Sequence, residues 1–270
     1  TEIMFDGNID ELTLTTNSQP AIMAVSSAIL ESIRSDNLID FNSIKAVAGH
    51  SLGEYSALYA TNSISFSSSI QLLEVRSKAM QESMPVGTGG MAAIIGKSML
   101  EVEDLLATIN DHGQIFIAND NADGQIVVSG EMSVINYLCD NFKELGVKRA
   151  LKLPVSAPFH CDLIHTASEE LSKVINEHEF DEFSYDFYSN VTSEQCSNIE
   201  TPDLLVKQIV SRVRWREIIE NMIKSGISTF IEVGPGNVLS NLVKRINKSI
   251  DTLSISKVED LEKLNTIDFR

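Results

Sequence analysis

The spacing of apolar residues changes along this 270-residue chain, and each spacing predicts a different kind of element. In segments 19–34 and 67–84 the apolar residues lie three or four positions apart, as on one face of a helix. Segment 44–48, between them, is a short and largely apolar run of the kind that forms a buried strand. Because helices alternate with short strands, we predict an α/β sheet for this part of the chain.

Between residues 87 and 153 the order of the elements is different. Alternating strands and helices are predicted there in the order β-α-β-β-α-β, at 91–95, 100–109, 115–118, 125–129, 132–145 and 148–153. This order is typical of a ferredoxin-like unit. The glycine-rich residues 85–90 before it lack the Lys-Ser/Thr ending of a phosphate-binding loop, so we predict a linker there.

The last third of the chain returns to longer helices and short strands. Helices are predicted at 160–175, 202–212, 215–224 and 237–247, and strands at 184–188, 228–233 and 252–255. We therefore predict two domains. Residues 1–86 and 154–270 form a larger α/β lobe with a parallel sheet, and residues 87–153 form a small ferredoxin-like lobe inserted into it.

Composition and charge narrow the class of partner. The chain has 38 Asp and Glu residues against 21 Lys and Arg residues, a formal net charge of −17, which argues against binding to nucleic acid. Three widely spaced cysteines suggest neither a disulfide framework nor a metal site, and they are consistent with a reducing compartment. No apolar run is long enough to span a bilayer, and residues 1–11 do not resemble a signal peptide. We expect a cytoplasmic protein without membrane contact.

The first candidate for chemistry is the motif Gly-His-Ser-Leu-Gly at residues 49–53. It follows the predicted strand and precedes a helix-compatible segment, which is the layout of a nucleophile elbow and makes the larger lobe similar to the α/β-hydrolases. In such an elbow Ser51 stands on a strained turn at the end of the sheet. We expect Gly49 and Gly53 to allow backbone contacts that a side chain would block. The helix start would direct N–H groups toward an oxyanion formed beside Ser51.

A serine hydroxyl needs a base, and His160 is the candidate. It follows the rigid segment 154–159 and is predicted to open a helix. We interpret the remaining histidines as structural or as surface residues: His50, His112, His165 and His178. An acidic third member, as in hydrolase triads, would have to lie between Ser51 and His160, where Asp120 and Asp123 are available but nothing marks either one.

An ordered set of motifs resembles the malonyl-CoA:acyl carrier protein transacylases of fatty-acid synthesis. The resemblance is carried by Gly-His-Ser-Leu-Gly-Glu-Tyr-Ser-Ala (49–57), Val-Arg-Ser-Lys-Ala-Met-Gln (75–81), Gly-Gly-Met-Ala-Ala-Ile-Ile-Gly (89–96), the segment 119–130, Leu-Pro-Val-Ser-Ala-Pro-Phe-His-Cys (153–161) and Glu-Val-Gly-Pro-Gly-Asn-Val-Leu (232–239). It covers nearly the whole chain, and the ordered set is far more specific than any one motif.

The resemblance implies a Ser–His dyad. Ser51 would take the malonyl group as an ester, and His160 would carry the proton. The backbone carbonyl of Gln208 would orient the imidazole, and the backbone N–H of Leu52 would be an oxyanion donor.

The resemblance also implies a specificity site. Arg76 would bind the free carboxylate of malonyl with the two-pronged geometry that lysine cannot copy. Phe159 matches the malonyl-preferring version of the pocket. Less specific matches to polar residues near the cleft between the lobes are Asn119, Asn121 and Gln125.

The implied reaction moves malonyl from coenzyme A to the phosphopantetheine thiol of acyl carrier protein, with no cofactor and no metal. We expect a monomer. The carrier is expected to be acidic, so it would need a local basic patch. The candidates are Lys143/Lys148/Arg149/Lys152 and Lys207/Arg212/Arg214/Arg216. Two other functions stay open: a serine thioesterase or hydrolase that uses water, and an inactive relative that only binds carrier protein.

The chain departs from the family at its start. Family members begin with an apolar strand that ends in Gly-Gln-Gly-Ser-Gln, and the glutamine supplies a second oxyanion donor. Residues 1–7 align beyond that motif, so a central strand and one donor are expected to be missing. Truncation or a mis-assigned start, a degraded relative, and replacement by another element are all open explanations.

Overall fold

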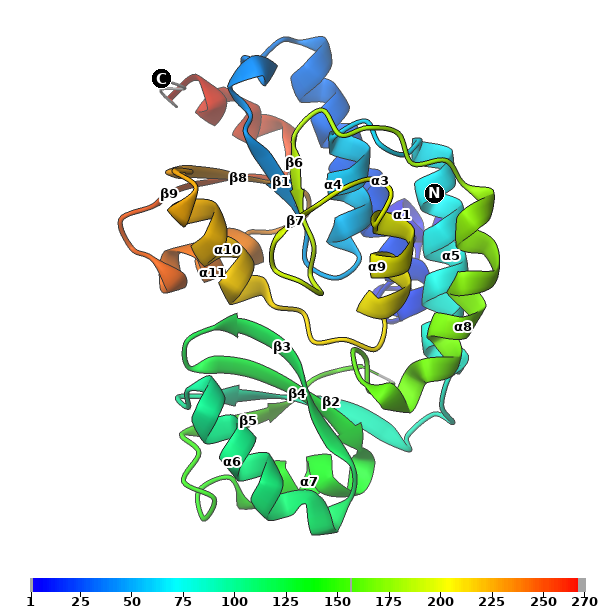
Figure 1. Cartoon of the computed structure of the whole chain (residues 1–270), viewed down its shortest axis with the longest axis vertical. Coiled ribbons are helices and arrows are strands. Elements are labelled where there is room, and N and C mark those ends of the chain that lie inside the picture. Colours follow the sequence, from blue (N-terminus) through cyan, green and yellow to red (C-terminus); the bar gives the residue numbers. More distant parts are fainter. Residues whose placement is uncertain (1, 156, 267–270) are drawn as a thin grey trace.

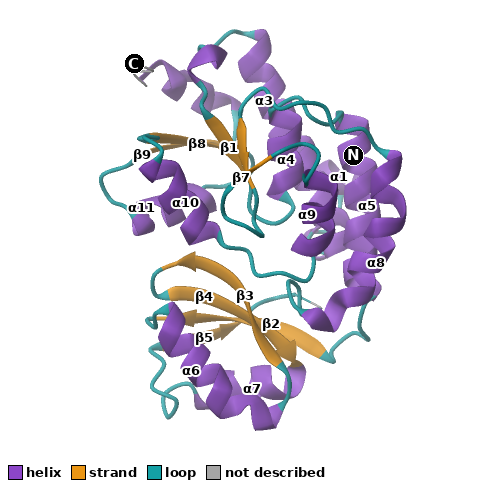
Figure 2. Ribbon diagram, in the orientation of Figure 1, coloured by secondary structure: helices purple, strands orange, loops and turns teal. Residues whose placement is uncertain are grey.

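The computed structural model describes residues 2–155 and 157–266 and has the predicted α/β fold. Two lobes lie one above the other in Figure 1, and the smaller one is formed by the middle of the chain. The same view coloured by secondary structure shows helices gathered along one side of the larger lobe (Figure 2). In the described residues, no helix combines the length and the apolar character needed to cross a membrane.

The small lobe has the ferredoxin-like order that the sequence predicts. Its antiparallel sheet has the strand order β3-β4-β2-β5, with two helices packed against it. The elements are β2 (Gly89–Ile95), α6 (Met99–Ile109), β3 (Ile115–Ala122), β4 (Gln125–Glu131), α7 (Met132–Asn141) and β5 (Arg149–Lys152). Ile94, Val102, Ile126 and Leu138 are fully buried in a core that belongs to this lobe. The predicted second helix is shorter than expected, because residues 142–145 form a turn.

The larger lobe has a helical layer on one side of its strands. Its longer helices there are α3 (Thr15–Ser35), α4 (Gly53–Ala60), α5 (Phe66–Glu82), α8 (His165–Val174) and α9 (Thr201–Gln208), preceded by α1 (Glu2–Asp6) and α2 (Ile9–Leu12). They share one apolar cluster that includes Met23, Leu58, Leu72 and Leu171. The helices α10 (Trp215–Lys224) and α11 (Val238–Ile246) pack around a second apolar cluster, which includes Trp215.

The strands of the larger lobe form two sheets, where the sequence predicts one parallel sheet. β1 (Ala46–Ala48) pairs in parallel with β6 (Asp186–Tyr188), and β7 (Gln195–Cys196) pairs antiparallel with β6. β8 (Thr229–Val233) pairs in parallel with β9 (Asp251–Ile255). Among the described strands β1 pairs only with β6 and β8 only with β9, so each keeps an unpaired edge. All residues of β1 and β8 are therefore only half-buried.

In the larger lobe α3 begins at Thr15, before the predicted start at residue 19. Two other predicted helices of this lobe also have different bounds, and tertiary contacts explain both. His160 does not open a helix, because its φ of 60° is left-handed; a short 3₁₀ turn begins at Asp162 and α8 at His165. α9 ends at Gln208, before the predicted end, because the chain then runs to the small lobe, where Val213 forms a β-bridge with Asn119. The remaining 3₁₀ turns are Phe41–Ser43, Asn110–His112, Ile175–Glu177 and Val258–Thr266.

Candidate active site

The turn at Ser51 connects β1 to α4 and has the strained geometry of an elbow. Ser51 has a φ of 52°, in the region that residues other than glycine rarely adopt. A Cβ atom at Gly49 would lie 1.8 Å from the backbone oxygen of Gly53, so only glycine fits at position 49. The expectation for Gly53 is wrong, because a Cβ there would meet nothing within 4 Å. Gly53 takes part in the close approach to Gly49 only through its backbone.

The structure brings Ser51 and His160 together. Ser51 Oγ lies 2.8 Å from His160 Nε2, and His160 Nδ1 lies 2.9 Å from the backbone oxygen of Gln208. Since a carbonyl oxygen can only accept, Nδ1 carries the proton and Nε2 is free to accept one from Ser51. Burial, and then the charge of Arg76, lower the pKa of His160 to about 3, so the imidazole is neutral.

Neither candidate acid reaches His160. The carboxylate of Asp120 is buried and forms an ion pair of 2.8 Å with Arg216. Asp123 is exposed in the turn between β3 and β4, where its backbone oxygen accepts from Arg245. A Ser–His–Asp triad is therefore absent from the part of the chain that the structure describes.

Arg76 on α5 is fully buried beside the serine. Its Nη2 donates to Ser51 Oγ at 2.9 Å and to the side-chain oxygen of Gln208 at 2.8 Å, while its Nη1 donates to Gln19 Oε1 at 2.5 Å. Its Nε has no hydrogen-bond partner. No carboxylate forms a salt bridge with Arg76 within residues 2–155 and 157–266. A buried guanidinium held only by neutral oxygens can bind the carboxylate of a ligand.

Behind the elbow lies a buried carboxyl group, Glu54. Oε1 accepts from the backbone N–H of Asn190 and Oε2 from the Gln208 side chain, each at 2.5 Å. Burial raises the pKa of Glu54 to about 8, against the opposing effect of these two hydrogen bonds and of Arg76. The side chain of Asn190 in turn bonds to the backbone on both sides of the serine turn, at Gly49 and Ser51.

Comparison with known proteins agrees with this geometry. Residues 1–266 match the family described as the acyl transferase domain. The chain belongs to this family. It is 38% identical over 263 residues to the malonyl CoA-acyl carrier protein transacylase of Bacillus subtilis, covering 96% of this chain and 81% of the relative. The corresponding protein of Staphylococcus aureus strain MSSA476 is 36% identical over 269 residues, covering 99% of this chain and 85% of the relative.

Solved structures of related acyl transferases have the same fold. The acyl-carrier-protein-S-malonyltransferase of Bartonella henselae superposes with a TM-score of 0.92 at 41% identity, covering 97% of this chain and 84% of that one. A malonyl-transacylase in complex with a type II PKS acyl-carrier protein gives a TM-score of 0.93 at 33% identity. The match covers 98% of this chain and 86% of that one. These likenesses confirm the predicted resemblance to the transacylases.

The other residues named from the acyl transferase resemblance lie at different places. The side-chain oxygen of Asn121 lies 2.8 Å from His50 Nε2 and so joins the small lobe to the elbow. Asn119 is buried in the β-bridge, and Phe159 is buried directly before His160. Gln125 stands at the start of β4 and accepts from Arg245; it has no described hydrogen bond to Ser51, Arg76 or His160. No hydrogen bond from the Leu52 N–H is found among the described backbone contacts, which leaves it free for a ligand.

Three residues of this site escaped the sequence reasoning: Gln19, Glu54 and Asn190. Glu54 directly follows the Gly-His-Ser-Leu-Gly motif, and that position was its only signal. Gln19 precedes Pro20 in α3 and is 4% exposed, although glutamine usually lies at a surface. Asn190 follows β6, which runs parallel to β1. Since parallel strands bring their carboxyl ends to one edge, a polar residue after β6 was a detectable candidate.

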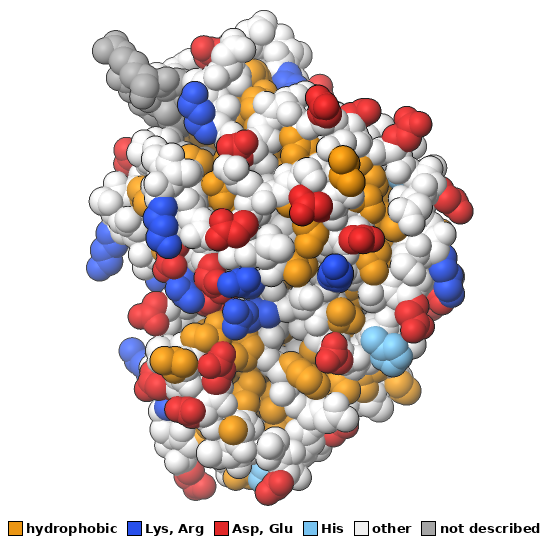
Figure 3. Space-filling model, viewed as in Figure 1, with side chains coloured by type: hydrophobic (Ala, Val, Ile, Leu, Met, Phe, Trp, Pro, Cys, Tyr) orange, Lys and Arg blue, Asp and Glu red, His pale blue; other side chains and the backbone are white. Residues whose placement is uncertain are grey.

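The three arginines of one basic patch are neutralised in the fold, whereas its Lys207 is exposed and has no ion pair among the described residues. Arg212, Arg214 and Arg216 form ion pairs, with the partners Glu217, Asp120 and Glu220. On the face drawn in Figure 3, basic side chains likewise lie among acidic ones. The small-lobe patch differs, because its four residues are exposed and have no ion pair among the described residues: Lys143, Lys148, Arg149 and Lys152.

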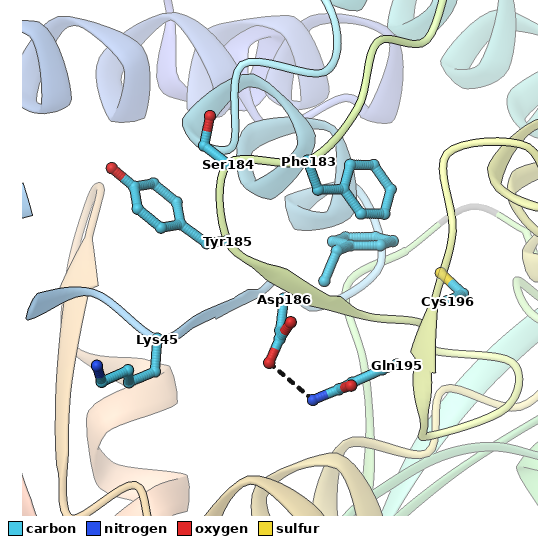
Figure 4. Close-up of a pocket in the computed structure, with 8 residues that line it drawn as sticks. Lys45, Phe183, Ser184, Tyr185, Asp186, Gln195 and Cys196 are labelled. Atoms are coloured by element: carbon cyan, nitrogen blue, oxygen red, sulfur yellow. Dashed lines mark hydrogen bonds between the residues drawn. The ribbon is translucent and has the colours of Figure 1, made fainter. Parts of the chain in front are cut away.

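A cavity of about 220 Å³ lies beside β6 and β7 and does not include Ser51 or His160 (Figure 4). Gln195 donates to Asp186 at its floor, and Phe183 and Cys196 line it. Burial raises the pKa of Cys196 to about 12, so its thiol is not reactive at neutral pH. The cavity therefore adds no group to the site.

Proposed function

We propose that this acyl transferase moves a malonyl group from coenzyme A to the phosphopantetheine thiol of acyl carrier protein, through an ester on Ser51. The observation that carries the proposal is the buried cation at 2.9 Å from the nucleophile: Arg76 touches Ser51 Oγ, which also touches the neutral His160. The names of the related proteins support the same substrate and acceptor. We expect the reaction to need no cofactor, to take place in the cytoplasm and to use a monomer.

In the first half-reaction His160 acts as the base. Nε2 accepts the proton of Ser51 while Oγ attacks the thioester carbonyl of malonyl-CoA. The C–S bond breaks, and the departing thiolate of coenzyme A takes the proton back from the imidazolium. Malonyl remains on Ser51 as an ester. The Gln208 carbonyl accepts the Nδ1–H bond throughout and keeps the ring in the tautomer that this step needs.

The second half-reaction reverses these roles. The phosphopantetheine thiol gives its proton to His160 Nε2, and the sulfur attacks the malonyl ester. The C–O bond breaks, and Ser51 Oγ regains the proton from the imidazolium. In both half-reactions the Leu52 N–H, at the start of α4, donates to the oxygen of the tetrahedral intermediate.

Arg76 selects the acyl group. The malonate carboxylate would take over N–H groups that now bond to Ser51, Gln19 and Gln208, and it would also use the unpartnered Nε. This pairing neutralises the cation whose charge lowers the pKa of His160, so the bound substrate makes the base stronger. An acetyl group has no carboxylate and gains neither effect.

Intact-protein mass spectrometry after mixing with malonyl-CoA tests the proposal. We expect a mass increase of one malonyl group on Ser51, its loss when carrier protein is added, and none in Ser51→Ala. Rapid release of free malonate without carrier would instead indicate a thioesterase or hydrolase. A folded protein that forms no adduct would indicate an inactive relative.

A further inference from the structure

Behind the serine turn lies a network of three buried polar side chains, those of Glu54, Asn190 and Gln208, and two of them, Glu54 and Asn190, have no role in the transfer steps described above. Glu54 is 1% exposed, and Asn190 and Gln208 are fully buried. Burying three polar side chains together is unfavourable unless their hydrogen bonds are satisfied. Their hydrogen-bond partners include the backbone of the elbow on one side and the Arg76 guanidinium on the other. These three side chains therefore connect the turn that carries Ser51 to Arg76.

Asn190 spans the elbow with its carboxamide. Nδ2 donates to the Gly49 carbonyl and Oδ1 accepts from the Ser51 N–H, both at 2.7 Å. The left-handed conformation of Ser51 is unfavourable and persists only if its surroundings enforce it. Any relaxed conformation of this turn would move one of the two backbone groups away from Asn190. The side chain therefore stabilises the conformation that places Oγ at 2.8 Å from His160.

Glu54 connects Asn190, which holds the elbow, to Gln208, which binds the Arg76 guanidinium. One oxygen accepts from the Asn190 N–H, and the other accepts from Gln208 Nε2. Gln208 Nε2 also donates to the Ser51 carbonyl at 2.8 Å, and Gln208 Oε1 accepts from Arg76 at 2.8 Å. Each Glu54 oxygen therefore faces an N–H donor and accepts from it. A glutamine at this position would bring an NH₂ group against one of two N–H donors.

We propose that Asn190 and Glu54 are positioning residues of the acyl transfer. Asn190 holds Ser51 in its strained conformation. Glu54 fixes the position of Arg76 relative to Ser51, because it binds both Asn190 and Gln208. The inference rests on the proposed function, because it assigns these residues to the same site. Neither residue touches the reacting atoms.

The role of Asn190 at the elbow is tested with a fluorophosphonate probe. Such a probe reacts with activated serines and carries no carboxylate for Arg76. The full chain, Asn190→Ala and the control Asn221→Ala are compared, with rates expressed per folded protein. Asn221 is a matched control because its side chain also donates to a loop carbonyl, that of Ser193, but does not contact the elbow. We expect Ser51 labelling to slow about 10- to 100-fold in Asn190→Ala and less than about twofold in Asn221→Ala.

The connection of Glu54 to Arg76 is tested by measuring kcat and KM for malonyl-CoA separately. Asn190→Ala should lower kcat with KM within about threefold, because the contact of Gln208 with Arg76 is intact. Glu54→Gln should slow probe labelling and also raise KM, because it disturbs Gln208 and Arg76 as well. If the two residues had only a structural role, the variants would give less folded protein, but Asn190→Ala would not affect kcat alone and Glu54→Gln would not also raise KM.

Equal labelling rates in Asn190→Ala and the parent would overturn the proposal. If Asn190→Ala does not fold, Asn190→Asp replaces it, since Asp keeps the acceptor for the Ser51 N–H and loses the donor to Gly49; an unchanged rate there is equally contrary. A parent that the probe labels but malonyl-CoA does not load contradicts the proposed function alone, and the labelling comparison still decides the role of Asn190. A parent that is not labelled at Ser51 overturns both.

Discussion

Arg76 shows how the surroundings of one residue define its chemistry. A helix arginine usually reaches solvent or a carboxylate, but this one is fully buried and its hydrogen bonds go to Gln19, Gln208 and the proposed nucleophile Ser51. The desolvated cation is tolerated because neutral oxygens accept most of its N–H groups. An anionic acyl group therefore gains more in this pocket than a neutral one.

Removing this cation should change the choice of acyl group. In Arg76→Ala we expect kcat/KM for malonyl-CoA to fall about 10- to 100-fold, the equivalent of one or two charge-assisted hydrogen bonds, and acetyl loading of Ser51 to increase. Loading rates with both thioesters, measured by mass spectrometry, check this. Arg76→Lys is the control and should recover only part of the malonyl rate. Normal malonyl loading by Arg76→Ala would disprove the role.

The pH dependence follows from the lowered pKa of His160. The proposed base is a neutral imidazole, and burial beside Arg76 holds the pKa of His160 at about 3, below the ordinary value of 6.5. In the folded protein the base thus stays unprotonated as pH falls through 6.5, and kcat/KM should show no loss there. The unfolded chain does bind a proton near pH 6.5, so the stability from this neutral group is present above 6.5 and is lost as pH falls toward 3. A profile of kcat/KM from pH 4.5 to 8 tests it, and an inflection near 6.5 would contradict it.

At the scale of the element, the strand–turn–helix unit from β1 through Ser51 to α4 depends on its two glycines unequally. Gly49 has the backbone of Gly53 at 1.8 Å from where its Cβ would be, whereas Gly53 has open space and stands at the start of α4. The motif alone does not reveal this difference, since both positions read as glycine.

We therefore expect opposite effects from two alanine substitutions. Gly49→Ala should disrupt the turn, with a loss of several kcal/mol in unfolding free energy and no labelling of Ser51, because a backbone contact cannot yield. Gly53→Ala should leave stability unchanged or raise it by roughly 0.4–1 kcal/mol, since alanine restricts the unfolded chain. Denaturant unfolding of both variants is the measurement, and equal losses would show that the described turn is wrong.

At the scale of the whole molecule, the distribution of charge decides where an acidic partner can bind. The net charge is −17, and the arginines of one predicted patch are bound in ion pairs. The small-lobe patch around Lys148 and Arg149 is exposed. Since surface charges act mainly on association, this patch should affect the encounter with carrier protein more than the chemistry.

Reversing that patch tests its role. The double variant Lys148→Glu/Arg149→Glu should raise KM for carrier protein about tenfold at low salt, with a smaller effect at high salt where charges are screened. The control is Lys78→Glu, an exposed charge change on α5. Carrier-protein kinetics that do not change at low salt, or that change equally in both variants, would remove the patch from the interface.

Much of the fold was predictable because its signals are local. The apolar spacing identified the helices, and the β-α-β-β-α-β order identified the small lobe, whose strands have the ferredoxin-like order in the structure. The end of α9 and the loop at His160 were not predictable in the same way. Their conformations depend on contacts with Asn119 and Gln208, which are distant in sequence.

By itself the sequence determined the α/β class, the family and the identity of Ser51, His160 and Arg76 as candidates, because motifs of fixed spacing carry that information. The contact of the Gln208 carbonyl with His160 was implied by the resemblance and is present in the structure. Only the tertiary structure decided that Arg76 donates to Ser51 and that Asn190 spans the elbow. It also showed that Asp120 belongs to Arg216 and not to the histidine. The physical reason is that hydrogen bonds and desolvation depend on distances of about 3 Å between residues far apart in the chain, and no local pattern encodes these distances.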